Sequence, residues 1–91
     1  MDFIHDKNRI ALYDPMQKLL AEVTFPDADE KTVNINHTFV DTSLRGQGVA
    51  GKLMKELAEE LRSQQKKAVL TCSYAVQWFE ERQDEYRDIL I

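Results

Sequence analysis

The hydrophobic pattern of this chain changes once, near residue 41, and that change limits the fold more than any other feature. Before it, apolar and polar residues alternate in short runs, as in residues 19–25 and 33–40, and turn residues separate the runs. A period of two is typical of half-buried strands. After it, apolar residues recur every three or four positions from Val49 to Leu61, which predicts an amphipathic helix. The sequence therefore predicts an α+β protein in which most strands precede the helix.

The strands of the first 40 residues are predicted to form a meander of about four antiparallel strands, because the turns between them are short. The last of these strands is expected over residues 33–40. Side chains on a strand point alternately to its two faces. We therefore expect one face of this strand to carry Val33, Ile35, His37 and Phe39.

After the long helix, the chain is predicted to add one strand and one or two short helices. Residues 68–72 are an apolar run of strand length, so about five strands are expected in all. The order strand, helix, strand implies a parallel crossover within one sheet. Apolar residues at helical spacing follow in residues 74–91. The predicted architecture is thus a mostly antiparallel sheet with one parallel pair, one long helix and a short helical C-terminus.

Length, charge and cysteine content narrow the class of protein. A chain of 91 residues can build one hydrophobic core, so residues 1–91 are predicted to be a single domain. The formal net charge of −4 lacks the basic footprint of a nucleic-acid-binding protein. No apolar run approaches the roughly 20 residues of a membrane helix, and the first residues have no signal-peptide pattern. Cys72 has no partner for an internal disulfide, which fits a reducing compartment, so a cytoplasmic protein with no membrane partner is expected.

All three glycines lie in residues 44–51, between the last N-terminal strand and the long helix. A glycine-rich turn that enters a helix presents unpaired backbone N–H groups at the positive end of the helix dipole, where phosphate binds. Arg45 adds a guanidinium suited to phosphate. The alternative is a tight turn that requires glycine for its geometry alone. The segment lacks the Gly-Lys-Ser/Thr ending of a P-loop, and no acidic residue follows at the ribose position of a dinucleotide-binding loop.

The segment Arg45-Gly46-Gln47-Gly48-Val49-Ala50 resembles the Arg/Gln-x-x-Gly-x-Gly/Ala loop that holds the acyl-CoA pyrophosphate in the GNAT superfamily of N-acetyltransferases. Residues 37–40, 72–75 and 85–90 look like the very short YjdJ-like branch of that superfamily. The resemblance covers most of residues 19–90. It implies a reduced GNAT fold, in which the strands at residues 33–40 and 68–72 run parallel and splay apart.

The resemblance also implies where acetyl-CoA or CoA would bind. The pantetheine arm would enter the splay and pair with the main chain of the first splayed strand, and the turn after the second would flank the thioester. The binding residues implied are Phe39, Val40, Arg45, Gly46, Gln47, Gly48, Val49, Ala50, Gly51, Ser73 and Tyr74. Residues 1–36 lack the two helices that in GNAT proteins build much of the acceptor wall, so the acceptor is not defined.

Two residues are catalytic candidates, Cys72 and His37. By the same resemblance Cys72 would lie near the thioester, where a thiolate could accept an acetyl group; the alternative is a small buried hydrophobe. Histidine titrates near neutral pH, so His37 could deprotonate an acceptor amine or Cys72; the alternative is a half-buried sheet histidine. A contact between the two across adjacent strands is geometrically possible. Members of the branch often carry Glu where this chain has Phe39, so a carboxylate base is lost there.

The sequence therefore favours a small acyltransferase that passes an acetyl group from acetyl-CoA to an unidentified amine or protein acceptor. A CoA-binding sensor or interaction module without turnover is the alternative, and a loop for a different nucleotide is a third. No metal is predicted, because Asp27, Asp29 and Glu30 lie in one acidic turn without a further ligand. We expect a monomer or weak dimer.

Overall fold

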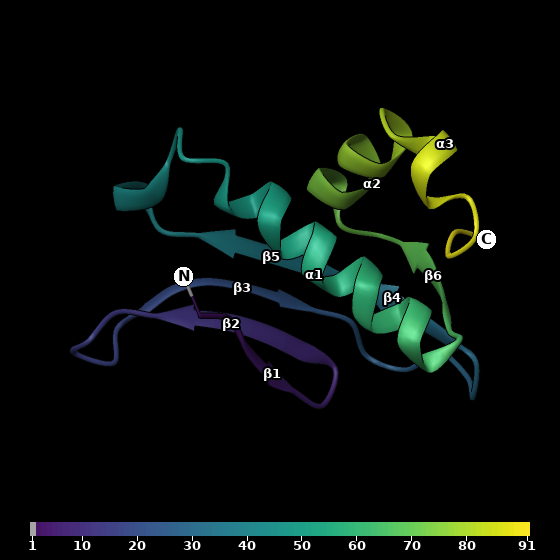
Figure 1. The fold of residues 1–91 in the computed structure, drawn as a ribbon, viewed down its shortest axis with the longest axis horizontal. Coiled ribbons are helices and arrows are strands. Elements are labelled where there is room, and N and C mark those ends of the chain that lie inside the picture. The colour runs from purple at the N-terminus through teal and green to yellow at the C-terminus, as the bar shows by residue number, and fades with distance from the viewer. Residues whose placement is uncertain (1) are drawn as a thin grey trace.

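The computed structural model describes residues 2–91 as an α+β fold in which one long helix crosses a sheet (Figure 1). Four strands form an antiparallel sheet in the order β1-β2-β3-β5, and two more form a parallel pair, β4-β6. The elements are β1 (Ile4–Asp6), β2 (Arg9–Tyr13), β3 (Leu19–Thr24), β4 (Thr32–Ile35), β5 (His37–Val40), the 3-10 helix η1 (Thr42–Leu44), α1 (Val49–Gln64), β6 (Lys67–Leu70), α2 (Ser73–Glu80) and α3 (Gln83–Tyr86). The predicted fold class, meander, long helix and short C-terminal helices are confirmed.

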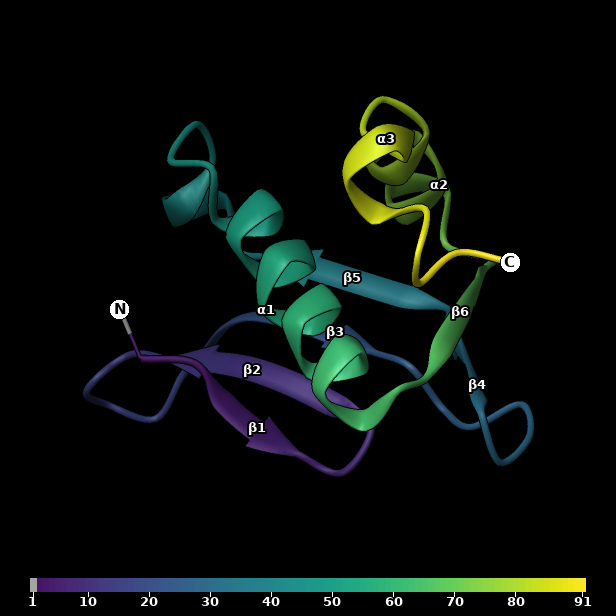
Figure 2. The same ribbon diagram turned by 45° about the vertical axis from the view of Figure 1, so that its right-hand side comes forward.

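The strand predicted over residues 33–40 is divided at Asn36 into β4 and β5, which gives six strands rather than about five. The carbonyl oxygen of Ile35 accepts hydrogen bonds from the backbone N–H groups of both Thr71 and Cys72, at 3.1 and 3.0 Å. The Asn36 N–H instead donates to Thr24 on β3. The chain therefore leaves the parallel pair at Asn36 and joins the antiparallel sheet, so β5 and β6 separate from this point (Figure 2).

The division at Asn36 also inverts the faces of the strand. Val33 and Ile35 are buried, whereas His37 and Phe39 are exposed. The prediction that these four side chains share one face was wrong, because one residue outside the ladder shifts the two-residue alternation by one position.

The helix α1 packs its apolar stripe on the sheet, as its spacing predicts. Its buried residues are Val49, Leu53, Met54, Leu57, Ala58 and Leu61. They meet buried side chains of β2, β3 and β4, among them Ile10, Val23 and Ile35. In the edge strand β1, His5 contacts Glu56 and Glu60 on the polar side of α1. Among residues 2–91, no helix is both long enough and apolar enough to cross a bilayer.

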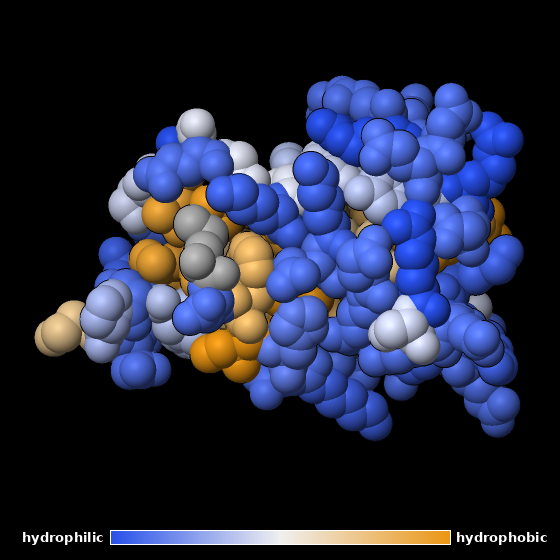
Figure 3. Space-filling view, viewed as in Figure 1, coloured by the Kyte–Doolittle hydropathy of each residue, from blue (hydrophilic) through white to orange (hydrophobic). Residues whose placement is uncertain are grey.

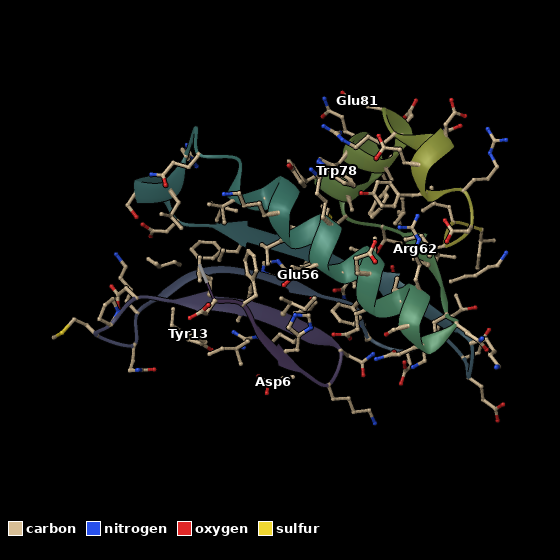
Figure 4. The ribbon with its side chains drawn as sticks, in the orientation of Figure 1. Asp6, Tyr13, Glu56, Arg62, Trp78 and Glu81 are labelled. Carbon is tan, nitrogen blue, oxygen red and sulfur yellow. The ribbon has the colours of Figure 1, made fainter. Side chains whose placement is uncertain are left out.

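The C-terminal helices pack on the remaining end of the core through three aromatic rings. Trp78, Phe79 and Tyr86 lie with ring centroids 5.0–5.5 Å apart. The chain then returns to β6, where Ala68 N–H donates to the Ile89 carbonyl at 2.7 Å. Arg62, near the end of α1, forms an ion pair with Asp88 at 2.8 Å (Figure 4). These contacts fix α2 beside the first turns of α1, which positions the site described next.

Candidate functional site

The glycine-rich loop ends in a helix start that carries no side-chain cap. Gly46 and Gly48 have φ angles of +82° and +71°, in the region that favours glycine. Gly48 is the N-cap of α1; it makes no side-chain cap hydrogen bond, and the first turn has no acidic residue. The first N–H groups of a helix have no partner within the helix. The loop therefore presents backbone donors and a positive helix end to solvent, as phosphate binding requires.

Some of the remaining loop residues are exposed to solvent and others are buried. Arg45 and Gln47 are exposed, and Arg45 forms no ion pair with any residue in the range 2–91. Val49 is buried in the core, so only its backbone can reach a ligand, and Ala50 is partly buried. The guanidinium of Arg45 is thus free to meet an anion.

A groove of about 500 Å³ continues from the loop between α1 and α2. A Cβ on Gly51 would lie 3.3 Å from Nε1 of Trp78, which is labelled in Figure 4, so the glycine lets α2 approach α1 closely. Lys52 and Lys55 line the groove and form no ion pair within residues 2–91, and hydrophilic side chains cover much of this side of the molecule (Figure 3). The groove is lined by Gly48, Gly51, Lys52, Lys55, Tyr74, Gln77, Trp78, Glu81 and Arg82.

Three residues that line the groove are not among the binding residues that the resemblance implies: Lys52, Lys55 and Trp78. Trp78 is mostly buried, and its ring carries the Arg82 guanidinium at 4.3 Å from the ring centroid. The spacing of one helical turn between Gly48 and Lys52 was the available signal, because residues four apart share a helix face.

Within residues 2–91, β5 pairs with β3 on one edge and with no strand on the edge that faces β6, so that edge is open. Asp41 N–H donates to the Leu20 carbonyl on β3, and backbone groups alternate between the two edges of a strand. The backbone groups of Thr38 and Val40 therefore point towards β6, whereas those of Phe39 point to β3. Of the two residues implied for main-chain contacts with pantetheine, Val40 is placed for that role, and Thr38 takes the position expected of Phe39. An open strand edge can accept an extended ligand as an added strand.

Cys72 lies where the splay begins, at the N-cap of α2. Its sulfur is 3.5 Å from Thr38 Oγ1, and the side chain is half-buried. Burial raises the pKa of the thiol, but the nearby backbone N–H groups of Ala75 and Tyr74 and the contact with Thr38 together bring the pKa of Cys72 below its ordinary value. The surroundings therefore increase the fraction of thiolate, the reactive form of cysteine.

Ser73 and Tyr74 begin α2 directly after Cys72. Tyr74 is 39% exposed and borders the groove. Burial raises the pKa of its hydroxyl, so Tyr74 is neutral at physiological pH. The turn thus lies between the groove and the splay.

His37 lies on the opposite face of β5 from the Cys72 contact. Thr38, which contacts Cys72, and His37 are neighbours in a strand, so their side chains point to opposite faces. His37 Nε2 is 3.2 Å from Glu22 Oε1, and half of the side chain is exposed. The two catalytic candidates flank the same point of the splay from opposite sides and form no direct pair.

Comparisons with known proteins identify the family and the fold. The family model described as GCN5-related N-acetyl-transferase matches residues 9–89. A solution structure from Staphylococcus aureus, assigned as a GCN5-like N-acetyltransferase, is 32% identical with a TM-score of 0.82; the match covers 99% of this chain and 87% of that one. A comparison with curated proteins finds no match.

Longer solved structures share the fold. A crystal structure from Deinococcus radiodurans R1, assigned as an acetyltransferase, has a TM-score of 0.65 at 21% identity; the match covers 84% of this chain and 52% of that one. The GNAT family N-acetyltransferase YhbS from Escherichia coli, crystallised with CoA, has a TM-score of 0.64 at 23% identity; the match covers 76% of this chain and 42% of that one. This chain thus spans about half the length of these two proteins. Because the family model matches residues 9–89 and the Staphylococcus aureus structure is 32% identical, the chain belongs to the GCN5-related N-acetyltransferase family.

Proposed function

We propose that this protein binds acetyl-CoA along the loop, groove and splay, and transfers the acetyl group to an amine acceptor. The observation that carries the proposal is the continuity of three features: the uncapped start of α1 at Gly48, the groove with Lys52 and Lys55, and the open edge of β5 that ends beside Cys72. The start of α1 suits a pyrophosphate, and the groove with its two lysines suits a phosphorylated nucleotide. The open edge of β5 suits an extended pantetheine arm.

In this proposal the chain acts mostly by positioning. The loop and the edge of β5 hold the thioester, and backbone N–H groups near it polarise its carbonyl. Cys72, with its lowered pKa, is the residue that could take the acetyl group first. His37 is the residue that could accept the proton of the acceptor amine. We also assign the chain to the short YjdJ-like branch on residues 37–40 and 72–75.

The experiment is an amide-resolved NMR titration with acetyl-CoA, followed by intact mass measurement of the same sample. We expect shifts centred on residues 38–51 and 72–78, and a mass increase of one acetyl group on Cys72. A Cys72→Ser control separates this adduct from non-enzymatic acetylation of lysines. No shift at millimolar acetyl-CoA would overturn the proposal.

A CoA-binding sensor or interaction module is the second candidate. Phe39 favours it, because this exposed ring stands on the same strand face as His37, where it supplies no proton acceptor. Binding of acetyl-CoA without transfer to any of a broad panel of amines would support this alternative over the acyltransferase.

A further inference from the structure

The four-stranded sheet has a second face, which α1 does not cover and which we call the open face. The register places Arg9 of β2, Glu22 of β3 and His37 of β5 on it. Thr24 of β3 is the cross-strand partner of both Arg9 and His37, so Glu22, two residues away on the same strand face, is their diagonal neighbour. Long side chains reach such diagonal neighbours.

The contacts of Glu22 divide its two carboxylate oxygens between different partners. Oε2 accepts hydrogen bonds from Arg9 Nη2 at 2.6 Å and from Arg9 Nε at 3.1 Å. Oε1 lies 3.2 Å from His37 Nε2. Arg9 is itself held by Tyr13, whose hydroxyl accepts a hydrogen bond from Nη1 at 3.1 Å. Glu22 is therefore fixed from one side, with its second oxygen directed at the imidazole.

This arrangement suits a histidine that gains a proton during a reaction. A carboxylate beside the ring stabilises the imidazolium that forms, and one oriented by a guanidinium needs little rearrangement to do so. His37 Nδ1 has no hydrogen-bond partner among the described residues 2–91, so it can receive the proton. Phe39 is the cross-strand partner of Glu22, so the carboxylate of this face comes from β3 rather than β5.

We propose that Glu22 is the positioning residue of His37 and that the acceptor amine approaches the thioester from the open face; this inference rests on the proposed function. The amine nitrogen forms a bond to the thioester carbon, and the carbon–sulfur bond breaks. His37 takes the proton that the nitrogen loses, beside the Glu22 carboxylate. The departing thiolate takes up one proton, which the imidazolium returns through solvent.

The test is a double-mutant cycle on His37 and Glu22 in the full chain. The rate of acetyl transfer from acetyl-CoA to benzylamine, spermidine and a short lysine peptide is followed by mass spectrometry of the acetylated amine. We expect kcat to fall about 100-fold in His37→Ala and about tenfold in Glu22→Gln, with the KM for acetyl-CoA unchanged. In the His37→Ala background, Glu22→Gln should cause no further loss, because Glu22 acts through the imidazole.

Two further variants separate positioning from structure. Glu59→Gln removes another glutamate that pairs with an arginine, Arg62 at 2.8 Å, on α1 and far from β5; it should leave the rate unchanged. Glu22→Asp keeps the charge and should lose less activity than Glu22→Gln, while amide spectra show whether each variant is folded.

The outcomes distinguish the two proposals. Wild-type protein that binds acetyl-CoA but acetylates none of the three amines contradicts the proposed function and, with it, this role of His37. If wild type turns over and Glu22→Gln keeps the wild-type rate, the inference alone is contradicted. The same holds if Glu22→Gln lowers the rate by the same factor in wild type and in His37→Ala.

Discussion

Replacement of Gly48 by alanine tests the conformation of the loop on which the proposed phosphate site depends. Gly48 has a φ of +71°, and no atom lies within 4 Å of a Cβ added there. The cost of alanine is therefore conformational and not steric. A left-handed conformation costs an L-residue with a Cβ about 1–2 kcal/mol. Each kcal/mol lowers the melting temperature of a domain of this size by about 4–8 °C.

Thermal unfolding followed by circular dichroism measures this loss directly. Gly48→Asn is the matched control, because asparagine enters the left-handed region more readily than alanine while also adding a Cβ. We expect Gly48→Ala to melt clearly below Gly48→Asn, and both below wild type. Equal melting temperatures for alanine and wild type would refute the reasoning, since the loop could then leave the left-handed conformation without cost.

Three further predictions follow from the site and from the edge of the sheet. Cys72→Ser should retain the acetyl-CoA shifts in NMR spectra but lose the acetyl adduct in the mass spectrum; an adduct that persists would exclude the thiolate as acceptor. Replacing both Lys52 and Lys55 by alanine should weaken CoA binding about three- to tenfold in calorimetry, and less at high salt, while Lys31→Ala on a distant turn should not; an unchanged affinity would show that the groove does not hold the nucleotide. Hydrogen bonding to Glu60 raises the pKa of His5, so its contribution to stability is complete below the pKa of the unfolded chain and is lost as pH rises through the folded value. The urea midpoint of wild type, relative to that of His5→Gln, should fall as the pH rises from about 6 to 8, and a constant difference would contradict this.

The elements with strong periodicity could be predicted from the sequence. The buried stripe from Val49 to Leu61 lies where the spacing indicates, because apolar burial decides the orientation of a helix on a sheet. The glycine loop could be predicted too, because all three glycines of the chain lie in residues 44–51. Two of them adopt the positive φ that glycine permits.

The break at Asn36 could not be predicted. No glycine or proline marks the break, and the prediction counted His37 with Val33, Ile35 and Phe39 on one face, so a single strand was expected. What divides the strand is a tertiary contact, the hydrogen bonding of the Ile35 carbonyl to Thr71 and Cys72 some 35 residues later. The contact between His37 and Glu22 depends on this break, because the break places His37 on the open face, and for that reason the contact could not be predicted either.

The break at Asn36 makes the site depend on the length of the chain as much as on its composition. If β4 and β5 instead continued through Asn36 as one regular strand, every side chain of β5 would change sides. His37 and Phe39 would then turn to the helix, and Thr38 and Val40 to solvent, without any change in their identity. Removal of Asn36 would keep the observed faces, because His37 would then follow the buried Ile35 directly and point away from it. The single residue outside the ladder therefore decides which side chains of β5 reach the open face.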